Sequence, residues 1–489
     1  MDGRLLSDAD RALRPGGGAR APWLEDALAT EPERAAPPLD GDLDVDIAIV
    51  GGGYTGLWTA LGILDRQPET RVAVLEADIC GGGASGRNGG FVNSWWDEIE
   101  TLVDLFGPSQ AAAAAEASAD SVHAIGAWCA ANRVDAQFRQ AGMLTVSTTP
   151  YHDAALPGGV ATARRLGRPD ALVALDAREV HEICRSPRFR GGVLMRDAAT
   201  VHPARLARGL RRVALQRGVA IHEGTRVLRV GRAGAERVGL AVRSPHGAFR
   251  VRAGHVVMAV NAWSAGWRAF RHSLLAWSSY MVRTQPMPDR IERDLGWTGG
   301  TSIVDARASV HYLHVTQDGR IAFGAGGGRP GFGGRIGPSF TDDIDAARRA
   351  AFGFRWFFPT LADIRLTDAW GGPIDVSPDH LPRFGTLPGG RIHYGFGYSG
   401  NGVGPSHLGG RILAALALES DEPVTRLAVV RAVSHAMPPE PFRYAGARVL
   451  RAAMIRREDR EEAGRRAPWW LRQLTSLPRR LGYHLGPGS

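Results

Sequence analysis

The feature that most constrains the fold is the stretch 44–77, which opens with a strand and a glycine turn. Residues 45–50 form a short, mostly apolar run, as expected for a strand buried on both faces of a parallel sheet. Three glycines follow in the dinucleotide pattern. Gly51 permits the tight turn, Gly53 lets a pyrophosphate approach the backbone, and Gly56 lets the next helix pack closely on the strand.

The second half of this stretch completes a βαβ unit. Apolar residues recur at helical spacing between 57 and 64, so the turn leads into a helix whose N-terminal amides face the phosphates. A second apolar strand, 72–75, ends at Glu76, where such folds place the carboxylate that accepts the ribose hydroxyls. A lone glycine motif is weak evidence, but here every part occurs in order. The stretch predicts a dinucleotide site and does not by itself distinguish NAD from FAD.

Length and composition predict a globular protein with two intertwined domains. The chain has 489 residues, of which 44% are hydrophobic and 22% charged, and it is too long for one ordinary core. It contains no run of about 18 apolar residues that could span a bilayer. The N-terminal residues lack the apolar core of a signal peptide, so we expect a cytoplasmic protein.

Cysteine and lysine usage narrows the chemistry. Cys80, Cys129 and Cys184 are isolated in the sequence, which favours reduced structural thiols and no metal site. The sequence has no lysine, so all 59 basic residues are arginine. Schiff-base chemistry and a phosphate-loop lysine are therefore excluded.

The net charge of +9 does not predict a nucleic-acid partner, because most of it lies in the C-terminal tail. Between residues 443 and 480, eleven arginines and four acids leave a net charge of +7. A tail helix with arginines on one side and tryptophans on the other could contact anionic lipid at a membrane surface. Packing of the tail on its own protein, or on another subunit, is the favoured interpretation.

A second glycine-rich run, 80–93, follows the nucleotide unit directly. It has six glycines in fourteen residues, which suits a backbone wrapped closely around a flat ligand. The alternative is a flexible surface loop. Its place immediately after the second strand, where the first crevice of the sheet is expected, favours the ligand.

The remaining elements predict an α/β fold: a dinucleotide-binding, Rossmann-like domain with a βαβ unit and a mixed sheet, and a second domain with an antiparallel sheet. We expect residues 101–190 to be mostly helical, with a strand at 142–149, and residues 192–230 to form a strand–helix–strand unit that rejoins the first sheet. A hairpin at 226–252 and a strand at 255–260 should follow. We then expect antiparallel strands over 275–358, and a strand, a glycine turn and a helix over 393–418. The nucleotide domain is expected over 41–125, 190–272 and 360–420, with the chain crossing several times into a substrate domain over 126–189 and 273–359. An N-terminal arm (1–40), which Trp23 and Leu24 could anchor, and a basic C-terminal extension (421–489) flank these domains.

Taken together, these motifs resemble the D-amino-acid oxidase superfamily of FAD-dependent oxidoreductases, and most closely its gamma-glutamylputrescine oxidoreductase branch. The motifs are GGGYTGL with Glu76, GASGRNGGF at 83–91, VNAW at 260–263, WGGPIDVSPDHLP at 370–382 and GFGYSGNGV at 395–403. The resemblance covers roughly residues 20–420. It implies non-covalent FAD, because no cysteine or histidine stands at a flavin-attachment position of the family.

The resemblance also implies which residues hold the cofactor. The first glycine turn would bind the pyrophosphate, Glu76 the adenosine ribose, and Val227 the adenine through its backbone. The 84–90 loop would line the ribityl chain and flavin, and 398–403 would close over the ring, with the dipole of a following helix facing the flavin N1–C2=O edge. The expected cofactor-binding residues are Gly51, Gly53, Tyr54, Thr55, Gly56, Glu76, Ala77, Gly83, Ala84, Ser85, Gly86, Arg87, Asn88, Gly89, Gly90, Phe91, Val227, Asn261, Ala262, Trp263, Gly371, Tyr398, Ser399, Gly400, Asn401, Gly402 and Val403.

In this class the flavin accepts a hydride equivalent at N5 from a carbon beside nitrogen, and the imine product hydrolyses. We expect a small primary or secondary amine as substrate, of gamma-glutamylputrescine type. Amino-acid-oxidising relatives carry a carboxylate-binding arginine where this chain has Thr316, although Arg283 or Arg307 could take its place. An amino-acid oxidase or dehydrogenase of the D-amino-acid, glycine or sarcosine type, and an inert flavin-binding scaffold, are the alternatives.

Aromatic side chains are the candidates for the substrate site, through cation–π contact with an alkylammonium. The expected catalytic residues are Trp95, His311, Tyr312 and Tyr398. Trp96, Tyr280 and His314 could complete this wall, although several of these rings are expected to belong to the core. The electron acceptor is oxygen or an unidentified carrier, since the lysine with which sarcosine-oxidase-like relatives activate oxygen is absent.

Overall fold

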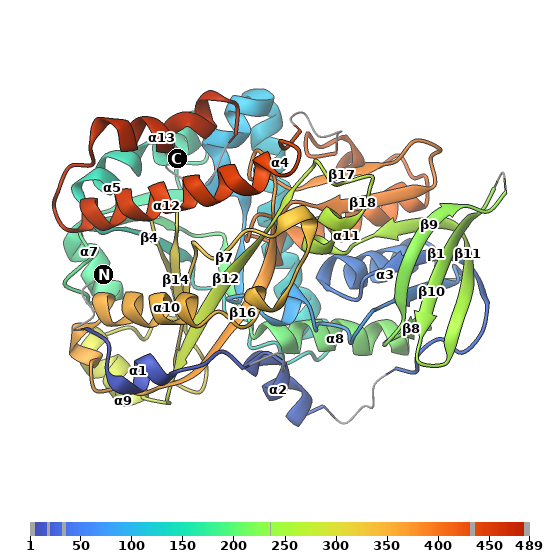
Figure 1. Ribbon diagram of the computed structural model, residues 1–489, viewed down its shortest axis with the longest axis horizontal. Helices are drawn as coiled ribbons and strands as arrows, with labels where there is room; N and C mark the ends of the chain where they lie inside the picture. Colours follow the sequence, from blue (N-terminus) through green and yellow to red (C-terminus); the bar gives the residue numbers. More distant parts are fainter. Residues whose placement is uncertain (1–4, 17–19, 32–35, 235, 431–435, 484–489) are drawn as a thin grey trace.

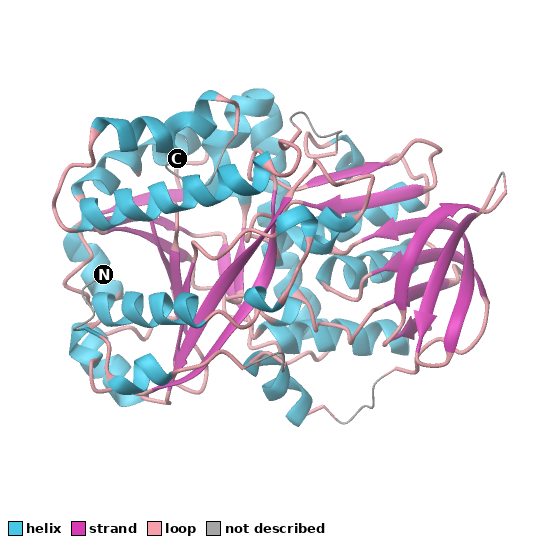
Figure 2. Cartoon of the chain, in the orientation of Figure 1, coloured by secondary structure: helices cyan, strands magenta, loops and turns pink. Residues whose placement is uncertain are grey.

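The computed structural model describes residues 5–16, 20–31, 36–234, 236–430 and 436–483. Its strands form two large sheets and one short pair, and Figures 1 and 2 show helices packed around both large sheets. The mixed α/β architecture with two sheets is as predicted from the sequence.

The first sheet is mostly parallel and contains the nucleotide unit. Its strands, in spatial order, are β17 (Arg383–Thr386), β18 (Ile392–Phe396), β11 (Gly247–Met258), β1 (Leu43–Val50), β2 (Val72–Leu75) and β8 (Ala220–His222). β1 pairs in parallel with β2 and β11, placing Val50 opposite Leu75 and Met258. The antiparallel strands β9 (Arg226–Arg232) and β10 (Val238–Ser244) extend from the start of β11 and fan out at one end of the molecule in Figure 1.

The second sheet is antiparallel except at one pairing, β4 with β13. Its strands, in spatial order, are β16 (Leu366–Val376), β12 (Leu275–Thr284), β15 (Ile321–Ala325), β14 (His311–Val315), β13 (Ser302–Asp305), β4 (Met143–Ser147), β6 (Gly191–Met195) and β5 (Leu172–Leu175). β6 and β16 come from segments that the sequence grouped with the nucleotide domain. They lie here instead, because β16 pairs along β12 and β6 pairs with β4. The short pair joins β3 (Phe91–Asn93) to β7 (Ala198–Thr200).

Helices cover both sheets and bury the main apolar clusters. They are α1 (Asp8–Ala12), α2 (Pro22–Ala29), α3 (Tyr54–Arg66), α4 (Ile99–Ala131), α5 (Pro150–Ala155), α6 (Pro157–Arg165), α7 (Ala177–Ile183), α8 (Pro203–Gln216), α9 (Pro288–Arg290), α10 (Ile344–Phe357), α11 (Val403–Ala417), α12 (Phe442–Glu462) and α13 (Trp469–Arg480). α3 and α11 pack against each other, so the helices that follow the first and last glycine turns share one core. Among the described residues, no helix combines the length and the apolar character needed to cross a bilayer.

The described part of the N-terminal arm is anchored by buried side chains. Trp23 and Leu24 are 2% and 1% exposed. Asp10 accepts two hydrogen bonds from Arg355, at 3.0 and 2.8 Å, and both side chains are buried. Because these contacts are made with residues of the second sheet and its helices, the arm is part of the packed protein.

The C-terminal extension packs back on its own chain. α12 and α13 run together along one face in Figure 1, and their contact buries Ala453, Ala467 and Leu471. Arg307, on the loop between β13 and β14, pairs with Glu458 of α12 at 2.9 Å.

Candidate active site

The first glycine turn has the tight geometry that a phosphate-binding turn needs. Gly51 has φ +108°, and a Cβ there would lie 2.4 Å from the carbonyl oxygen of Ala259. A Cβ on Gly56 would lie 2.0 Å from the carbonyl oxygen of Gly51, so only glycine lets α3 pack this closely on β1. Gly53 caps α3 without a side chain, which leaves the start of the helix open to an anion. The turn therefore fits the pyrophosphate that the sequence predicts.

Glu76 lies directly after β2 and beside this turn. Its carboxylate accepts hydrogen bonds from the backbone N–H of Gly52 at 2.7 Å and of Asp78 at 2.9 Å, and burial raises its pKa. Its carbonyl accepts the N–H of Thr225 at 2.7 Å, which brings the start of β9, with Val227, alongside. Ala77 follows at the surface. The structure thus brings together Glu76 and the start of β9 with Val227, the residues expected to bind the adenosine half.

The second glycine run forms an ordered cradle rather than a flexible surface loop. Gly90 has φ +77°, and a Cβ there would lie 2.3 Å from the carbonyl oxygen of Val201. The Asn88 side chain donates to the carbonyls of Ala84 and Ser85, at 3.1 and 2.9 Å, and accepts the N–H of Gly90 at 2.8 Å. These bonds close the loop on itself.

Other contacts fix the flanks of this loop. The Ser85 hydroxyl accepts the N–H of Tyr54 at 2.9 Å, which joins the loop to the first residue of α3. Arg87 donates to the carbonyl of Gly371, on β16, at 3.2 Å. Further residues of the predicted set lie along the same path: Gly83 faces the Trp263 ring, Gly86 packs on Gly81, and Phe91 begins β3.

The last glycine turn meets the first one in space. The Tyr398 hydroxyl is 2.7 Å from the Thr55 hydroxyl, and both are buried. Ser399 and Gly400 have φ +53° and +95°, so the chain reverses sharply before α11 begins. The N-cap of α11, Gly402, again contributes no side-chain hydrogen bond. The two helix N-termini that the sequence assigns to the two ends of the cofactor thus belong to one site.

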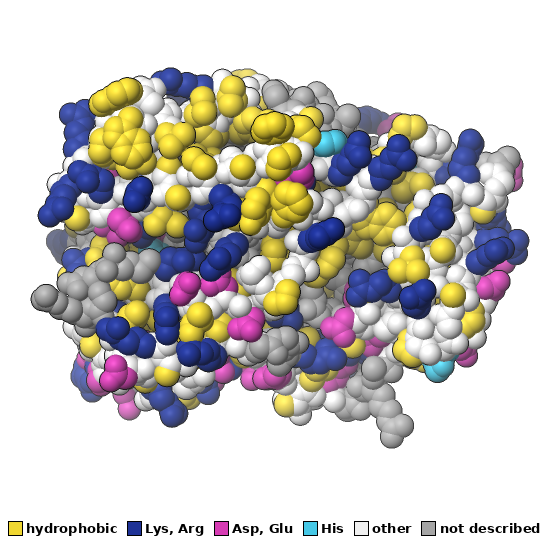
Figure 3. Space-filling view, viewed as in Figure 1, with side chains coloured by type: hydrophobic (Ala, Val, Ile, Leu, Met, Phe, Trp, Pro, Cys, Tyr) yellow, Lys and Arg dark blue, Asp and Glu magenta, His cyan; other side chains and the backbone are white. Residues whose placement is uncertain are grey.

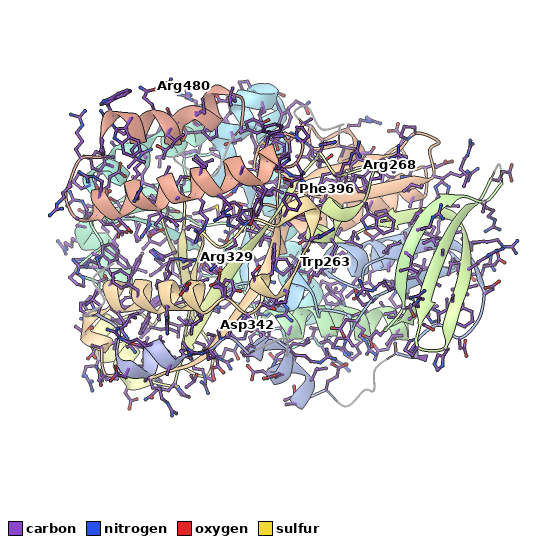
Figure 4. The ribbon with its side chains drawn as sticks, in the orientation of Figure 1. Trp263, Arg268, Arg329, Asp342, Phe396 and Arg480 are labelled. Atoms are coloured by element: carbon purple, nitrogen blue, oxygen red, sulfur yellow. The ribbon has the colours of Figure 1, made fainter. Side chains whose placement is uncertain are left out.

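The predicted VNAW segment borders the same region. Asn261 has φ +45°, Ala262 is buried, and Trp263 is 41% exposed. Figure 4 labels Trp263 near the middle of the molecule, and a Cβ on Gly83 would lie 3.4 Å from its ring. Trp263 therefore covers the outer side of the 83–91 loop.

A large cavity, of about 1280 Å³, opens beside the second and last glycine turns. The glycine turns contribute Asn88, Gly89, Gly400 and Asn401 to its wall, and the second sheet contributes Ser279 and Tyr312. The Tyr312 hydroxyl lies 2.8 Å from the Ser279 hydroxyl, and burial raises the pKa of Tyr312 to about 12. This polar end of the cavity adjoins the predicted flavin position.

The structure separates the four predicted catalytic residues. Tyr312 lines the cavity, and Tyr398 holds the two glycine turns together. His311 points to the other face of β14, where its Nδ1 lies 2.8 Å from Asp305 and its ring packs on Phe323. Trp95 is 1% exposed and lies in the main hydrophobic core. We therefore assign structural roles to Trp95 and His311.

The remaining rings of the predicted wall are also placed in the packed interior. Trp96 is fully buried, and the Tyr280 hydroxyl donates to the carbonyl of Ser339 at 2.9 Å. His314 stacks on Trp23, and burial lowers the pKa of His314 to about 4. The His314 imidazole behind the 83–91 loop is therefore neutral.

Asp97 is a cavity residue that the sequence did not single out as catalytic. Its Oδ2 accepts a hydrogen bond from the Asn401 amide at 2.9 Å. Its Oδ1 is buried and has no hydrogen-bond partner. Burial, with the nearby charge of Glu98, raises the pKa of Asp97 well above its ordinary value. The sequence pattern that could have identified Asp97 is the pair of acids directly after Trp95 and Trp96.

The arginines that could replace a missing carboxylate clamp are already engaged. Arg283 pairs with Asp26 at 2.5 Å and with Asp368 at 3.0 Å. Arg307 pairs with Glu458 and Glu462 of α12. Thr316 bonds to Asp318 and the Arg320 backbone within its own turn. Within the described chain, no group of three or more His, Cys, Asp or Glu residues could hold a metal ion, and all three cysteines are buried free thiols.

Comparison with known proteins agrees with this geometry. A family model described as "FAD dependent oxidoreductase" matches residues 46–416. Over 407 residues the chain is 28% identical to "Probable oxidoreductase OrdL" of Rhizobium meliloti (strain 1021), covering 81% of this chain and 88% of that protein. It is 29% identical to gamma-glutamylputrescine oxidoreductase of Escherichia coli (strain K12) over 383 residues, covering 77% and 84%.

Solved structures share the fold. L-proline dehydrogenase from P. horikoshii superimposes with a TM-score of 0.63 at 19% identity, covering 78% of this chain and 96% of that one. Glycine oxidase from Geobacillus kaustophilus gives a TM-score of 0.63 at 22% identity, covering 80% and 100%.

Proposed function

The chain belongs to the family of FAD-dependent oxidoreductases, and we propose that it oxidises the carbon–nitrogen bond of a primary or secondary amine. Bound FAD supplies the two-electron acceptor for the hydrogen on the carbon beside nitrogen. The amine loses two electrons and two protons overall, and the imine product takes up water to give a carbonyl compound and an amine or ammonia. A gamma-glutamylputrescine-like amine is the specific candidate, because one relative is named for that substrate.

Asp97 is the observation that carries the amine proposal. An alkylammonium ion arriving in the cavity meets the half-buried Asp97 side chain, whose Oδ1 is buried and has no hydrogen-bond partner. Once ionised, the Asp97 carboxylate pairs with this cation and takes the ammonium proton, because burial and the charge of Glu98 raise the pKa of Asp97 and so its affinity for a proton. The amine then carries the free electron pair that oxidation requires. Asn401 holds the carboxyl group in place.

An amino acid substrate is less well served by this cavity. Its carboxylate needs a cation, and the two arginines considered for that role are held by acidic partners. A carboxylate placed near Asp97 would also be repelled once Asp97 ionised. We therefore rank the amino-acid oxidase or dehydrogenase alternative second, and an inert flavin scaffold third.

One anaerobic experiment separates these three alternatives. The holoenzyme is mixed with primary and secondary amines, D-amino acids, glycine and sarcosine, and the flavin absorbance is followed. Bleaching by amines alone supports the proposal, whereas bleaching by amino acids alone overturns the amine assignment. Flavin that no compound bleaches indicates a scaffold. Subsequent mixing with oxygen distinguishes an oxidase from an enzyme that uses another carrier, and acid precipitation tests whether the FAD stays non-covalent.

A further inference from the structure

The outer wall of the cavity is built by α12 and α13, which lie beyond the matched family region 46–416. The apolar side chains that these helices contribute are Val449, Leu450, Met454, Ile455, Leu474 and Leu477. The cavity that Asp97, Ser279 and Tyr312 line therefore also has an apolar wall, which the C-terminal extension provides.

This wall is fixed to segments that themselves border the cavity. The Glu458 carboxylate of α12 accepts hydrogen bonds from Arg307 and from the backbone N–H of Ser309, both at 2.9 Å. Arg451 Nε donates to the carbonyl of Gly327 at 2.7 Å. Because Arg307, Ser309 and Gly327 all line the cavity, these contacts hold α12 in the cavity wall.

The mouth of the cavity is apolar as well. Phe442, Leu477 and Leu481 line it while 72%, 45% and 58% exposed. Figure 3 shows hydrophobic side chains gathered on the face that α12 and α13 occupy in Figure 1, with arginines between them. Large exposed apolar groups of this kind mark a site of contact with an apolar ligand or partner.

Several charged side chains that line the cavity have hydrogen-bonded partners. Arg307 is paired with Glu458, and Arg443 with Glu440 at 2.8 Å. Glu98 lies 2.8 Å from His380. The cavity also exceeds the roughly 300–1,000 Å³ that accommodates most small ligands. Its lining includes both residues expected to hold the flavin and the apolar side chains of α12 and α13.

We infer that the substrate amine carries a hydrophobic chain or ring, which lies along α12 and α13 while the nitrogen is held at Asp97. This inference rests on the proposed function, and within it the inference favours an apolar amine over the polar gamma-glutamylputrescine-like candidate. A short, polar diamine would leave the chamber lined by Leu450, Met454 and Ile455 unfilled. A longer alkyl chain would displace water from it, with a gain proportional to the apolar area buried.

Binding can be tested without turnover. Linear alkylamines with two methyl groups on the carbon beside nitrogen have no hydrogen to lose there, so they bind without being oxidised. The Kd of a series from about four to about twelve carbons, measured calorimetrically on the holoenzyme, should tighten by about threefold per methylene. A negative heat-capacity change that grows with chain length should accompany it.

Matched variants of α12 test where the alkyl chain of the ligand binds. Leu450→Gln/Met454→Gln makes the wall polar at nearly constant volume and keeps helix-forming residues. In this variant the gain in alkylamine affinity should fall below about 1.5-fold per methylene, because the alkyl chain no longer contacts an apolar surface. Ala452→Gln, on the exposed side of the same helix, should retain the wild-type slope.

The outcomes separate this inference from the proposed function. If short amines bleach the flavin but Kd is independent of chain length, the amine activity stands and the hydrophobic substrate class is overturned. A steep dependence that the double variant retains overturns the role of α12. If no amine of any length binds or bleaches the flavin, the proposed function itself fails.

Discussion

Asp97 has a buried oxygen, Oδ1, without a hydrogen-bond partner, and the residue lies in the cavity wall; a buried polar atom left unpaired is costly unless a ligand pairs with it. Its neighbour Glu98 serves as a natural comparison. Glu98 also lines the cavity, but its carboxylate is already paired with His380 at 2.8 Å. The two acids therefore differ in what they can offer a cationic substrate.

Asp97→Asn should lower kcat/KM for amines by about a hundredfold or more, since it removes the cation partner and proton acceptor at constant volume. Rapid-mixing flavin reduction under anaerobic conditions measures this effect, and flavin content checks folding. Glu98→Gln should lose less than about tenfold, because the His380 contact can be kept as a neutral hydrogen bond. Equal losses in both variants would contradict the role given to Asp97.

Asp375 on β16 is a second buried acid, with a structural role. It accepts the N–H of Gly397 just before the last glycine turn, and burial raises its pKa from 3.8 to about 7. A raised folded-state pKa means that the native protein binds this proton more tightly than the unfolded chain. The resulting stabilisation is complete below about pH 4 and is lost as the pH rises through 7.

Asp375→Asn should remove this pH dependence, because its amide oxygen can still accept the Gly397 N–H without titrating. The shift corresponds to a differential effect on the order of 4 kcal/mol across the window. Thermal unfolding of both holoproteins at pH 5 and pH 8 measures it. The Tm of the variant relative to wild type should be higher at pH 8 than at pH 5, and parallel pH profiles would refute the assignment.

The sequence could not decide which of two neighbouring side chains faces the cavity. His311 and Tyr312 are adjacent on β14, so they face opposite sides of the sheet. The β14 strand is covered on both sides, and each ring has a packed environment. Only the position of the cavity decides that Tyr312 belongs to the site.

At the scale of elements, the first and last glycine turns are joined through Thr55 on α3 and Tyr398 before α11. Each turn was recognised from its own local pattern. Their direct contact explains how residues 343 positions apart can form one cofactor site.

Thr55→Val and Tyr398→Phe should each lower the free energy of unfolding by about 1–3 kcal/mol, because each leaves one buried hydroxyl without its partner. The double variant should lose less than the sum of the two, since both polar groups are gone. Denaturant unfolding of the four proteins forms a double-mutant cycle. Strictly additive losses would show that this hydrogen bond is not a coupling between the turns.

β6 and β16 show the limit of reading elements from sequence. Both have ordinary strand patterns, and their neighbours along the chain suggested the nucleotide domain. Their partners, β4 and β12, lie about 50 and 90 residues away. The usual pairing of strands that are adjacent in sequence gives no guidance over such a distance. The division of the chain into domains therefore stays a proposal, with these two strands assigned to the second sheet.

At the scale of the whole molecule, both terminal extensions are attached through buried ion pairs to segments that belong to the second sheet and its helices. Asp10 reaches Arg355 at the N-terminal end, and Glu458 reaches Arg307 at the C-terminal end. In both pairs the extension supplies the acid, and the arginine comes from the body of the protein.

Glu458→Gln should destabilise the protein by about 3 kcal/mol, because the nearly buried Arg307 loses a charged partner. Hydrogen exchange should quicken along α12, which depends on this contact for its attachment. Glu461→Gln is the matched control, since Glu461 pairs with Arg457 within the same helix. Unchanged exchange along α12 in Glu458→Gln would mean that other contacts hold the wall.

The sequence alone determined the glycine turns and the βαβ unit ending at Glu76, because each depends on residues that are close in the chain, and it predicted FAD as the cofactor. Backbone geometry at Gly51, Gly56 and Gly90 requires glycine whatever the rest of the molecule does. Only the tertiary structure placed Asp97 beside Asn401, buried Trp95 in the core, and set α12 against Arg307. These contacts join residues about 150 or more positions apart or depend on which face is filled, and no local pattern encodes that.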